Sequence, residues 1–125
     1  MCSHTYKLTF EERSNYLYVR LLGKDSFAAS LSYWNEIADK ARALNARKLL
    51  VHEDLIGEIN NHEMFDLITD LLPSGLLNVQ IAVFDENTEN RRINAIGQAL
   101  AHNMGGQVEV FESLEAAQEW LNETA

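Results

Sequence analysis

The spacing of apolar residues changes repeatedly along this chain, and this change constrains the fold more than any other feature. Apolar and polar residues alternate in Tyr6–Phe10 and again in Leu17–Leu21, as in β-strands with one buried face. From Phe27 to Leu44 the apolar residues recur every three or four positions, which is the period of an amphipathic helix. Because the polar pair Ser14 and Asn15 separates the first two runs, we expect a β-hairpin followed by a helix.

The same change of period recurs further along the chain. Lys48–His52 is a short, nearly continuous apolar run that predicts a strand covered on both faces. Val79–Phe84 predicts another buried strand, and Val108–Phe111 predicts a last strand. Helical spacing follows each run and predicts three more helices, so the expected order is β-β-α-β-α-β-α-β-α. The apolar stripes of these helices are Met64, Leu67, Ile68, Leu71 and Leu72; Ile93, Ile96, Leu100 and Met104; and Leu114, Ala117, Trp120 and Leu121.

An α/β fold follows from this order, because strands that alternate with helices pair in parallel and place the helices on the sheet. We expect a mostly parallel central sheet with an antiparallel N-terminal hairpin and flanking helices. The 125 residues suit one domain, and no linker, repeat or low-complexity stretch divides them. A single domain over residues 1–125 is therefore expected.

The predicted helix ends carry residues that are typical of helix caps. Asp25 or Ser26 can cap the first helix, and Asn45 suits its C-terminal end. Asn60 precedes the second helix and is followed three positions later by Glu63, which is the pattern of a capping box. These signals place the helix boundaries independently of the apolar stripes.

The formal net charge of −9 is concentrated in one segment. No Lys or Arg occurs between Leu49 and Asn90, whereas the rest of the chain holds equal numbers of acidic and basic residues. Nucleic acids and anionic membrane surfaces bind clustered Lys and Arg, so neither is an expected partner. The acidic residues of this segment are Glu53, Asp54, Glu58, Glu63, Asp66, Asp70, Asp85, Glu86 and Glu89.

No segment of the sequence predicts secretion or membrane insertion. No apolar run reaches the ~20 residues that span a bilayer, and the N-terminal residues lack the apolar core of a signal peptide. Cys2 is the only cysteine, so no disulfide can form within the chain. We expect a cytoplasmic protein without membrane insertion.

Three segments carry a resemblance to a known family. They are the N-terminal hairpin, the stretch Leu49–Gly57 with its Asp-x-x-Gly sequence, and the stretch Val110–Ala117, in which a strand leads into Phe-x-x-Leu-x-x-Ala. With the order of elements, they resemble the STAS fold, the family of the anti-sigma-factor antagonist SpoIIAA. The chain is most similar to the small bacterial SpoIIAA-like proteins that are grouped with STAS and CRAL-TRIO domains. The resemblance implies a STAS (SpoIIAA-like) fold and a non-enzymatic protein-interaction module.

One departure from that family bears on function. The sigma-factor antagonists carry a phosphorylatable Ser at the start of the helix that follows the Asp-x-x-Gly turn, where phosphorylation adds about two negative charges. The corresponding segment here, Ile59–Phe65, has no hydroxyl side chain, and none occurs between His52 and Ile68. The usual phosphoserine switch is therefore not expected. Glu63 is either a permanent substitute for that charge or only a capping residue.

The second predicted helix carries an acidic face. Glu63, Asp66 and Asp70 fall opposite its apolar stripe, either as a solvated face or as a docking surface. The resembled family meets its partners through this helix, and uniform charge favours an oppositely charged protein. The expected partner is a protein with a basic surface, or a second copy of the chain in a dimer. The predicted partner-binding residues are Asp54, Glu58, Asn60, Asn61, His62, Glu63, Asp66 and Asp70.

A second candidate site is the rim beyond the carboxyl ends of the strands, where parallel sheets bind ligands. His52–Asp54 and Asp85–Asn87 are expected there, and their carboxylates and imidazole suit a divalent cation. Their spacing matches no metal motif, and the sequence has no nucleophile elbow or Gly-rich phosphate loop. We therefore assign no metal, cofactor or catalytic residue, and a metal-dependent enzyme at His52, Glu53 and Asp54 ranks last among the hypotheses.

Two arginines open the third predicted helix, where positive charge opposes the helix dipole. Arg91 and Arg92 are expected to pair with Asp85, Glu86 or Glu89, or to contact an anionic ligand or a partner's carboxylate. The resemblance to CRAL-TRIO domains implies an alternative function. In that alternative the protein binds a small hydrophobic or lipid ligand in an apolar pocket under the first or third helix.

Overall fold

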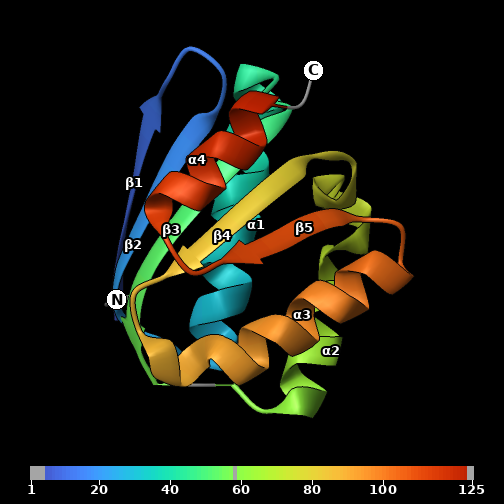
Figure 1. The fold of residues 1–125 in the computed structure, drawn as a ribbon. Coiled ribbons are helices and arrows are strands. Elements are labelled where there is room, and N and C mark those ends of the chain that lie inside the picture. The colour runs from blue at the N-terminus through green and yellow to red at the C-terminus, as the bar shows by residue number, and fades with distance from the viewer. Residues whose placement is uncertain (1–4, 58, 124–125) are drawn as a thin grey trace.

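The computed structural model describes residues 5–57 and 59–123, and within them it confirms the predicted order of strands and helices (Figure 1). Cys2 and Glu58 lie outside the described residues. Three short 3₁₀ turns, at Leu72–Ser74, Leu76–Asn78 and Thr88–Asn90, connect some of the elements. The elements are β1 (Tyr6–Glu12), β2 (Leu17–Lys24), α1 (Phe27–Leu44), β3 (Lys48–Ile56), α2 (Asn61–Leu71), β4 (Gln80–Asp85), α3 (Arg91–Asn103), β5 (Gln107–Phe111) and α4 (Leu114–Glu123).

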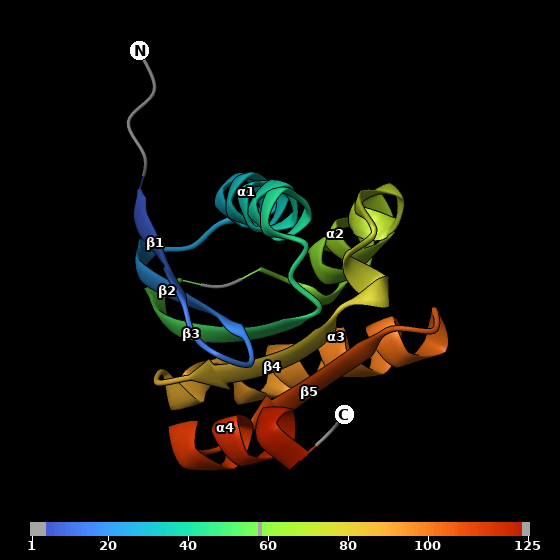
Figure 2. The ribbon, with the colours of Figure 1, turned by 90° about the horizontal axis from the view of Figure 1, so that it is seen from above.

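The strands lie side by side in the order in which the chain makes them, β1-β2-β3-β4-β5. Strands β1 and β2 pair antiparallel, and every later pair is parallel. Because parallel crossovers are right-handed, a sheet that grows in one direction places its crossover helices α1, α2 and α3 on one face. Figure 2 shows α1 and α2 on that face and α4 on the other. Helix α3 packs against both α2 and β5.

Each face of the sheet has its own apolar core. On the face that α1, α2 and α3 cover, Val19, Leu21, Leu49 and Val51 are fully buried against these helices. On the face that α4 covers, a smaller cluster forms from Leu50, Ala82, Ala117 and Leu121. Burying one such aliphatic side chain contributes about 1.5–3 kcal/mol, so the larger core dominates the stability of the fold.

The predicted caps form at both ends of α1 and at the start of α2. The Ser26 hydroxyl accepts a hydrogen bond from the Ala29 N–H (3.0 Å), and Asn45 takes the left-handed conformation at the C-terminal end with φ 55°. The Glu63 N–H donates to the Asn60 side chain (2.8 Å), and the Glu63 carboxylate accepts from the Asn60 N–H (3.0 Å). The capping box therefore fixes where α2 begins and how Glu63 is held.

Strand β3 is longer than the sequence pattern predicted, and the prediction that it ends at His52 is wrong. It pairs with β2 as far as Ile56, which lies opposite Lys24, because β2 is long enough to supply hydrogen-bond partners to that point. Glu53 and Asp54 therefore belong to the strand instead of the rim, and successive strand residues face opposite sides. Glu53 faces the large core and Asp54 faces the other side of the sheet.

The described residues contain no helix that is long and apolar enough to cross a bilayer.

Candidate functional site

Helix α2 presents an exposed surface that combines carboxylates with an aromatic ring. Asp70 is exposed, and Asp66 lies 3.4 Å from the imidazole of His62, which is itself largely exposed. Phe65 leaves 46% of its surface exposed. Within the described residues, no Lys or Arg pairs with a carboxylate of this helix. We call these residues the α2 surface: Asn61, His62, Glu63, Phe65, Asp66 and Asp70.

A shallow groove connects the start of α2 with the start of α3. Its walls are Asn60, Asn61 and His62 on one side and Arg92 with Glu89 on the other. The structure therefore brings Arg92 close to the predicted partner-binding residues of α2. The α2 surface and this groove adjoin at Asn61 and His62.

Two other predicted residues lie elsewhere. Asp54 is exposed on the face of β3 opposite to α2, so it does not adjoin the α2 surface. The Arg91 guanidinium pairs with Glu112, with 3.3 Å between Nη1 and Oε1, and not with the neighbouring Asp85, Glu86 or Glu89. Arg91 instead borders a separate surface hollow beside β5.

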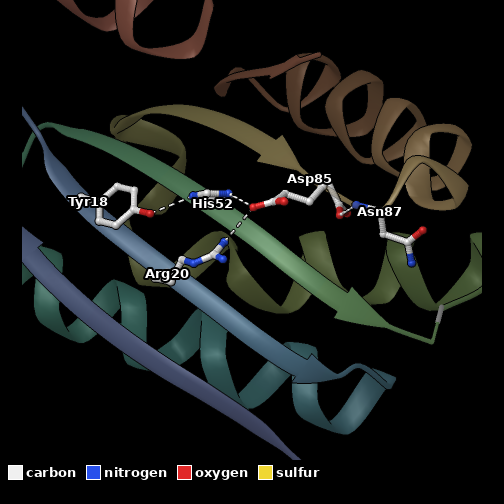
Figure 3. A network of polar contacts seen from close by, with 6 residues as sticks. Tyr18, Arg20, His52, Asp85 and Asn87 are labelled. Atoms are coloured by element: carbon white, nitrogen blue, oxygen red, sulfur yellow. Dashed lines mark hydrogen bonds and ion pairs between the residues drawn. The ribbon is translucent and has the colours of Figure 1, made fainter. Parts of the chain in front are cut away.

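A polar network links β2, β3 and the end of β4 on the side of the sheet opposite to α1 (Figure 3). The Tyr18 hydroxyl lies 2.8 Å from Nδ1 of His52, and Nε2 of His52 lies 2.6 Å from the Glu86 carboxylate. Because a carboxylate only accepts, Nε2 is the donor, and neutral His52 accepts from Tyr18 at Nδ1. The Arg20 guanidinium adds a longer contact to Glu86 at 3.4 Å.

His52 is thus a buried histidine with both ring nitrogens in hydrogen bonds. Burial lowers its pKa below the ordinary value, the hydrogen bond to Glu86 acts in the opposite direction, and the charge of Arg20 lowers it further. A neutral imidazole held on both sides ties three strands together and leaves no free ring nitrogen for a substrate. This arrangement supports a structural role.

The predicted metal rim is not assembled. Strand alternation directs His52 and Asp54 to one face and Glu53 to the other, because the strand continues through all three residues. The described residues hold no group of three or more His, Cys, Asp and Glu side chains placed to bind a metal ion. The hypothesis of a metal-dependent site at these residues therefore lacks its geometry.

A cavity of about 100 Å³ lies between the sheet and helices α1, α2 and α3. Most of its wall is apolar, with Met64 and Leu67 from α2, Ile93 from α3 and Val83 from β4. The predicted position of an apolar pocket was under the first or third helix, and this cavity is lined by residues of both helices, although α2 also forms much of the wall. A set of polar groups gathers at one end.

Two carboxylates at this polar end have full sets of donors. Asp25 accepts from the hydroxyls of Ser30 (2.6 Å) and Tyr33 (3.0 Å) and from the Ser26 N–H. Asp85 accepts from the side-chain amides of Asn90 (3.0 Å) and Asn94 (2.9 Å). The Asn87 N–H also donates to Asp85, at 2.9 Å (Figure 3). These bonds hold both carboxylates in place beside the cavity.

Glu53 differs from Asp25 and Asp85, the two other carboxylates at the polar end of the cavity. Only 7% of its surface is exposed, it lines the cavity, and its side chain receives no hydrogen bond from any described residue. Burial raises its pKa well above the ordinary glutamate value, and the charges of Asp85 and Asp25 raise it further. Glu53 therefore holds its proton at pH values where a solvated glutamate has lost it.

The sequence prediction placed Glu53 on an exposed rim and so missed this buried position. The sequence did contain a pattern that indicates this position. Glu53 is an even number of residues from Leu49, Val51 and Leu55, all of which face the large core, so in a continuous strand it points to the same side. If the predicted strand had been continued past His52, the alternation of side chains between its two faces would have placed Glu53 on the side of the helices. The polarity of Glu53 and Asp54 obscured this pattern.

Comparisons with known proteins agree on the fold. No family model matches the chain, and no curated protein matches it. A solved anti-sigma factor antagonist from Mycobacterium paratuberculosis matches with a TM-score of 0.67 and 9% identity, over 97% of both chains. An uncharacterised DUF3478-family protein with a SpoIIAA-like fold from Shewanella loihica PV-4 matches with a TM-score of 0.57 and 18% identity, over 97% of this chain and 98% of its own. The expected SpoIIAA-like fold is confirmed.

Proposed function

We propose that this chain, which has the SpoIIAA-like fold, is a protein-interaction module that docks a basic partner on the α2 surface. The observation that carries the proposal is an exposed aromatic ring, Phe65, on the same helix as Asp66 and Asp70, two carboxylates with which no Lys or Arg of the described residues pairs. A similar solved structure is an anti-sigma factor antagonist, which favours a protein partner.

The composition of the α2 surface suits a heterologous partner. An exposed aromatic ring can enter an apolar recess, which is where binding energy concentrates in protein interfaces. The surrounding carboxylates speed encounter with a positive surface and reject negative ones. Arg92, across the groove from Asn61 and His62, provides one position for an acidic group of the partner.

The same charges disfavour a dimer formed through α2. In a two-fold symmetric interface the same patch meets itself, so Asp66 and Asp70 of two copies would face each other. Like charges across an interface cost several kcal/mol. Of the two partners considered from the sequence, we therefore propose the basic protein and not the second copy.

The interaction is proposed to lack a phosphoserine switch. The segment from His52 to Ile68 has no hydroxyl side chain, and Glu63, at the third helical position, is held by the capping box. The negative charge of the α2 surface is therefore permanent.

Charge reversal on α2 tests the proposal. In an Asp66→Lys, Asp70→Lys variant, we expect loss of the proteins that co-purify with the wild-type chain, identified by quantitative mass spectrometry. The capping box stays intact in this variant, so the helix keeps its N-terminal end. The matched control is Glu115→Lys, Glu119→Lys, which reverses two exposed charges at the same helical spacing on α4.

The two variants give distinguishable outcomes. Proteins lost from the α2 variant and retained by the α4 variant, and confirmed to bind as purified proteins, support the proposal. Retention of every co-purifying protein and an unchanged oligomeric state in the α2 variant would contradict it. Equal loss in both variants would also contradict it, because net charge alone would then explain binding.

The cavity favours a second candidate function, the binding of a small ligand. Pockets for drug-sized molecules measure about 300–1,000 Å³, whereas this cavity measures about 100 Å³. A lipid acyl chain therefore does not fit the cavity, and a molecule of a few heavy atoms does. Native mass spectrometry of the purified protein tests this candidate, since a retained small molecule would appear as a defined mass increment.

A further inference from the structure

We propose that the cavity beneath α2 and α3 binds a small aliphatic amine, with the ammonium group at Glu53 and the apolar part between the helices. This inference is independent of the α2 surface, because the cavity and the exposed face lie on opposite sides of α2. It goes beyond a hydrophobic ligand by assigning the chemistry of the polar group.

The apolar part of the cavity sets the size of the ligand. Met64 and Ile93 face the cavity from α2 and α3, and the two helices approach closely at Gly97. A Cβ at Gly97 would lie 3.0 Å from the Met64 sulfur, so glycine permits this approach. An apolar cavity of about 150 Å³ binds benzene, so 100 Å³ admits a ligand with about four heavy atoms.

The polar end sets the charge of the ligand. Ser30 and Tyr33 donate to Asp25, and two asparagines donate to Asp85, whereas Glu53 receives no donor from any described residue. No Lys, Arg or His is among the described residues that line the cavity. A ligand that brings both positive charge and N–H donors would satisfy Glu53, and an alkylammonium group has both.

Other ligand classes fit less well. An anionic ligand would meet three acidic side chains, Asp25, Glu53 and Asp85, with no cation among the described lining residues. A metal ion needs several ligands within coordination distance, and the described residues offer no such group. A neutral alcohol can accept one hydrogen bond from protonated Glu53 but brings no compensating charge.

Binding is coupled to release of a proton. Before binding, burial and the charges of Asp85 and Asp25 raise the pKa of Glu53 and so favour its neutral, protonated form. The alkylammonium ion enters with its own proton, Glu53 loses its proton to solvent, and the two form an ion pair. No covalent bond forms or breaks other than the O–H bond of Glu53.

The pH dependence follows from the groups that face Glu53. These are Asp25 at the start of α1, Tyr33 in α1 and Asp85 at the end of β4, and no described residue of α2 or α3 that lines the cavity is ionisable. Affinity for the amine therefore rises as pH increases through the raised pKa of Glu53. It falls again only when the amine loses its own proton, at about pH 10.4 if it resembles lysine.

The test uses n-propylamine, with 1-propanol as a neutral probe of the same length, titrated into ¹⁵N-labelled full-length protein and followed by NMR. We expect shifts centred on Gly97 and Ala101, and affinity for the amine about tenfold or more above that for the alcohol, as for a hydrogen bond to a charged group. Equal affinity for both probes, or shifts confined to the α2 surface, would overturn the proposal.

Variants identify the residue that carries the selectivity. Glu53→Gln keeps the shape but cannot form the ion pair, so the preference for the amine is expected to disappear. Asp54→Asn, which removes the same charge from the adjacent, exposed strand position, is expected to bind like the wild type. If the Glu53→Gln variant still bound n-propylamine more tightly than 1-propanol, the proposal would be wrong.

A measurement on the wild-type chain makes the test independent of folding of the variants. The ¹³C shift of the Glu53 side-chain carboxyl reports its protonation directly. We expect it to move from the protonated to the ionised value as n-propylamine saturates the protein at neutral pH. A carboxyl shift that stays at the protonated value at saturation would contradict the ion pair.

Discussion

At the scale of single residues, Glu53 makes stability depend on pH. Its pKa is raised in the folded protein by burial and by Asp85 and Asp25, so the folded chain keeps a proton that the unfolded chain has lost. This contribution is fully present below the ordinary glutamate pKa and is lost as pH rises through the raised value. Asp25, whose pKa burial also raises, acts in the same direction.

Glu53→Gln is therefore expected to flatten this dependence. The free energy of unfolding of the wild type should fall as pH rises from the ordinary glutamate pKa through the raised value, and that of the variant should fall less. Urea unfolding across this range measures both curves. Parallel curves for the two proteins would show that Glu53 does not titrate differently in the folded and unfolded states.

Tyr18 gives a second prediction at this scale. Tyr18→Phe removes the donor to Nδ1 of buried His52, so we expect a loss of about 1 kcal/mol in the free energy of unfolding. The ¹⁵N shifts of the imidazole should still report Nε2–H, because Glu86 holds that tautomer. A switch of tautomer in the variant would mean that Tyr18, and not Glu86, orients the ring.

At the scale of elements, the capping box separates the stability of α2 from its proposed binding role. Asn60→Ala removes the acceptor for the Glu63 N–H and is expected to lower the free energy of unfolding by about 1 kcal/mol. The neighbouring Asn61→Ala, with no hydrogen bond in the capping box, should change it by less than about 0.5 kcal/mol. Chemical denaturation of both variants checks the difference.

Phe65→Ser is the complementary change on the same helix. The ring is 46% exposed and therefore partly packed, so its removal should lower the free energy of unfolding by about 1 kcal/mol. Partner binding should weaken clearly, because an exposed aromatic ring is a typical centre of interface energy. A large loss of stability without loss of binding would instead assign Phe65 to the fold.

The strands and helices also show how much of the fold and of the cavity could be predicted from the sequence. Periodicity and caps gave the order of strands and helices, the capping box at Asn60 and most of the inner faces of the helices. Leu72, which was predicted on the apolar stripe of the second helix, is an exception, because it lies just beyond the end of α2 and is 41% exposed. The end of β3 could not be found in this way, because Glu53 and Asp54 look like rim residues while the ladder with β2 carries the strand to Ile56. The cavity depends on how α2 and α3 approach at Gly97, which no local pattern specifies.

At the scale of the whole molecule, the uneven charge predicts how partner binding responds to salt. The net charge is −9, and all of the excess lies between Leu49 and Asn90. Electrostatic steering weakens as the Debye length falls from about 10 Å at 0.1 M salt to about 3 Å at 1 M. Stopped-flow measurement should show that the association rate falls steeply with salt while the dissociation rate changes less.

The sequential strand order has a consequence for synthesis of the chain. Each strand after β1 finds its neighbour already made, so pairing can advance in step with the ribosome and no strand waits for a partner from a later part of the chain. The face that carries Leu50 and Ala82 is an exception, since its covering residues Ala117 and Leu121 come from α4, the last helix. A nascent chain stalled before Ser113 would thus expose an apolar sheet face, which makes the last helix the step that protects this protein from aggregation and from quality-control chaperones.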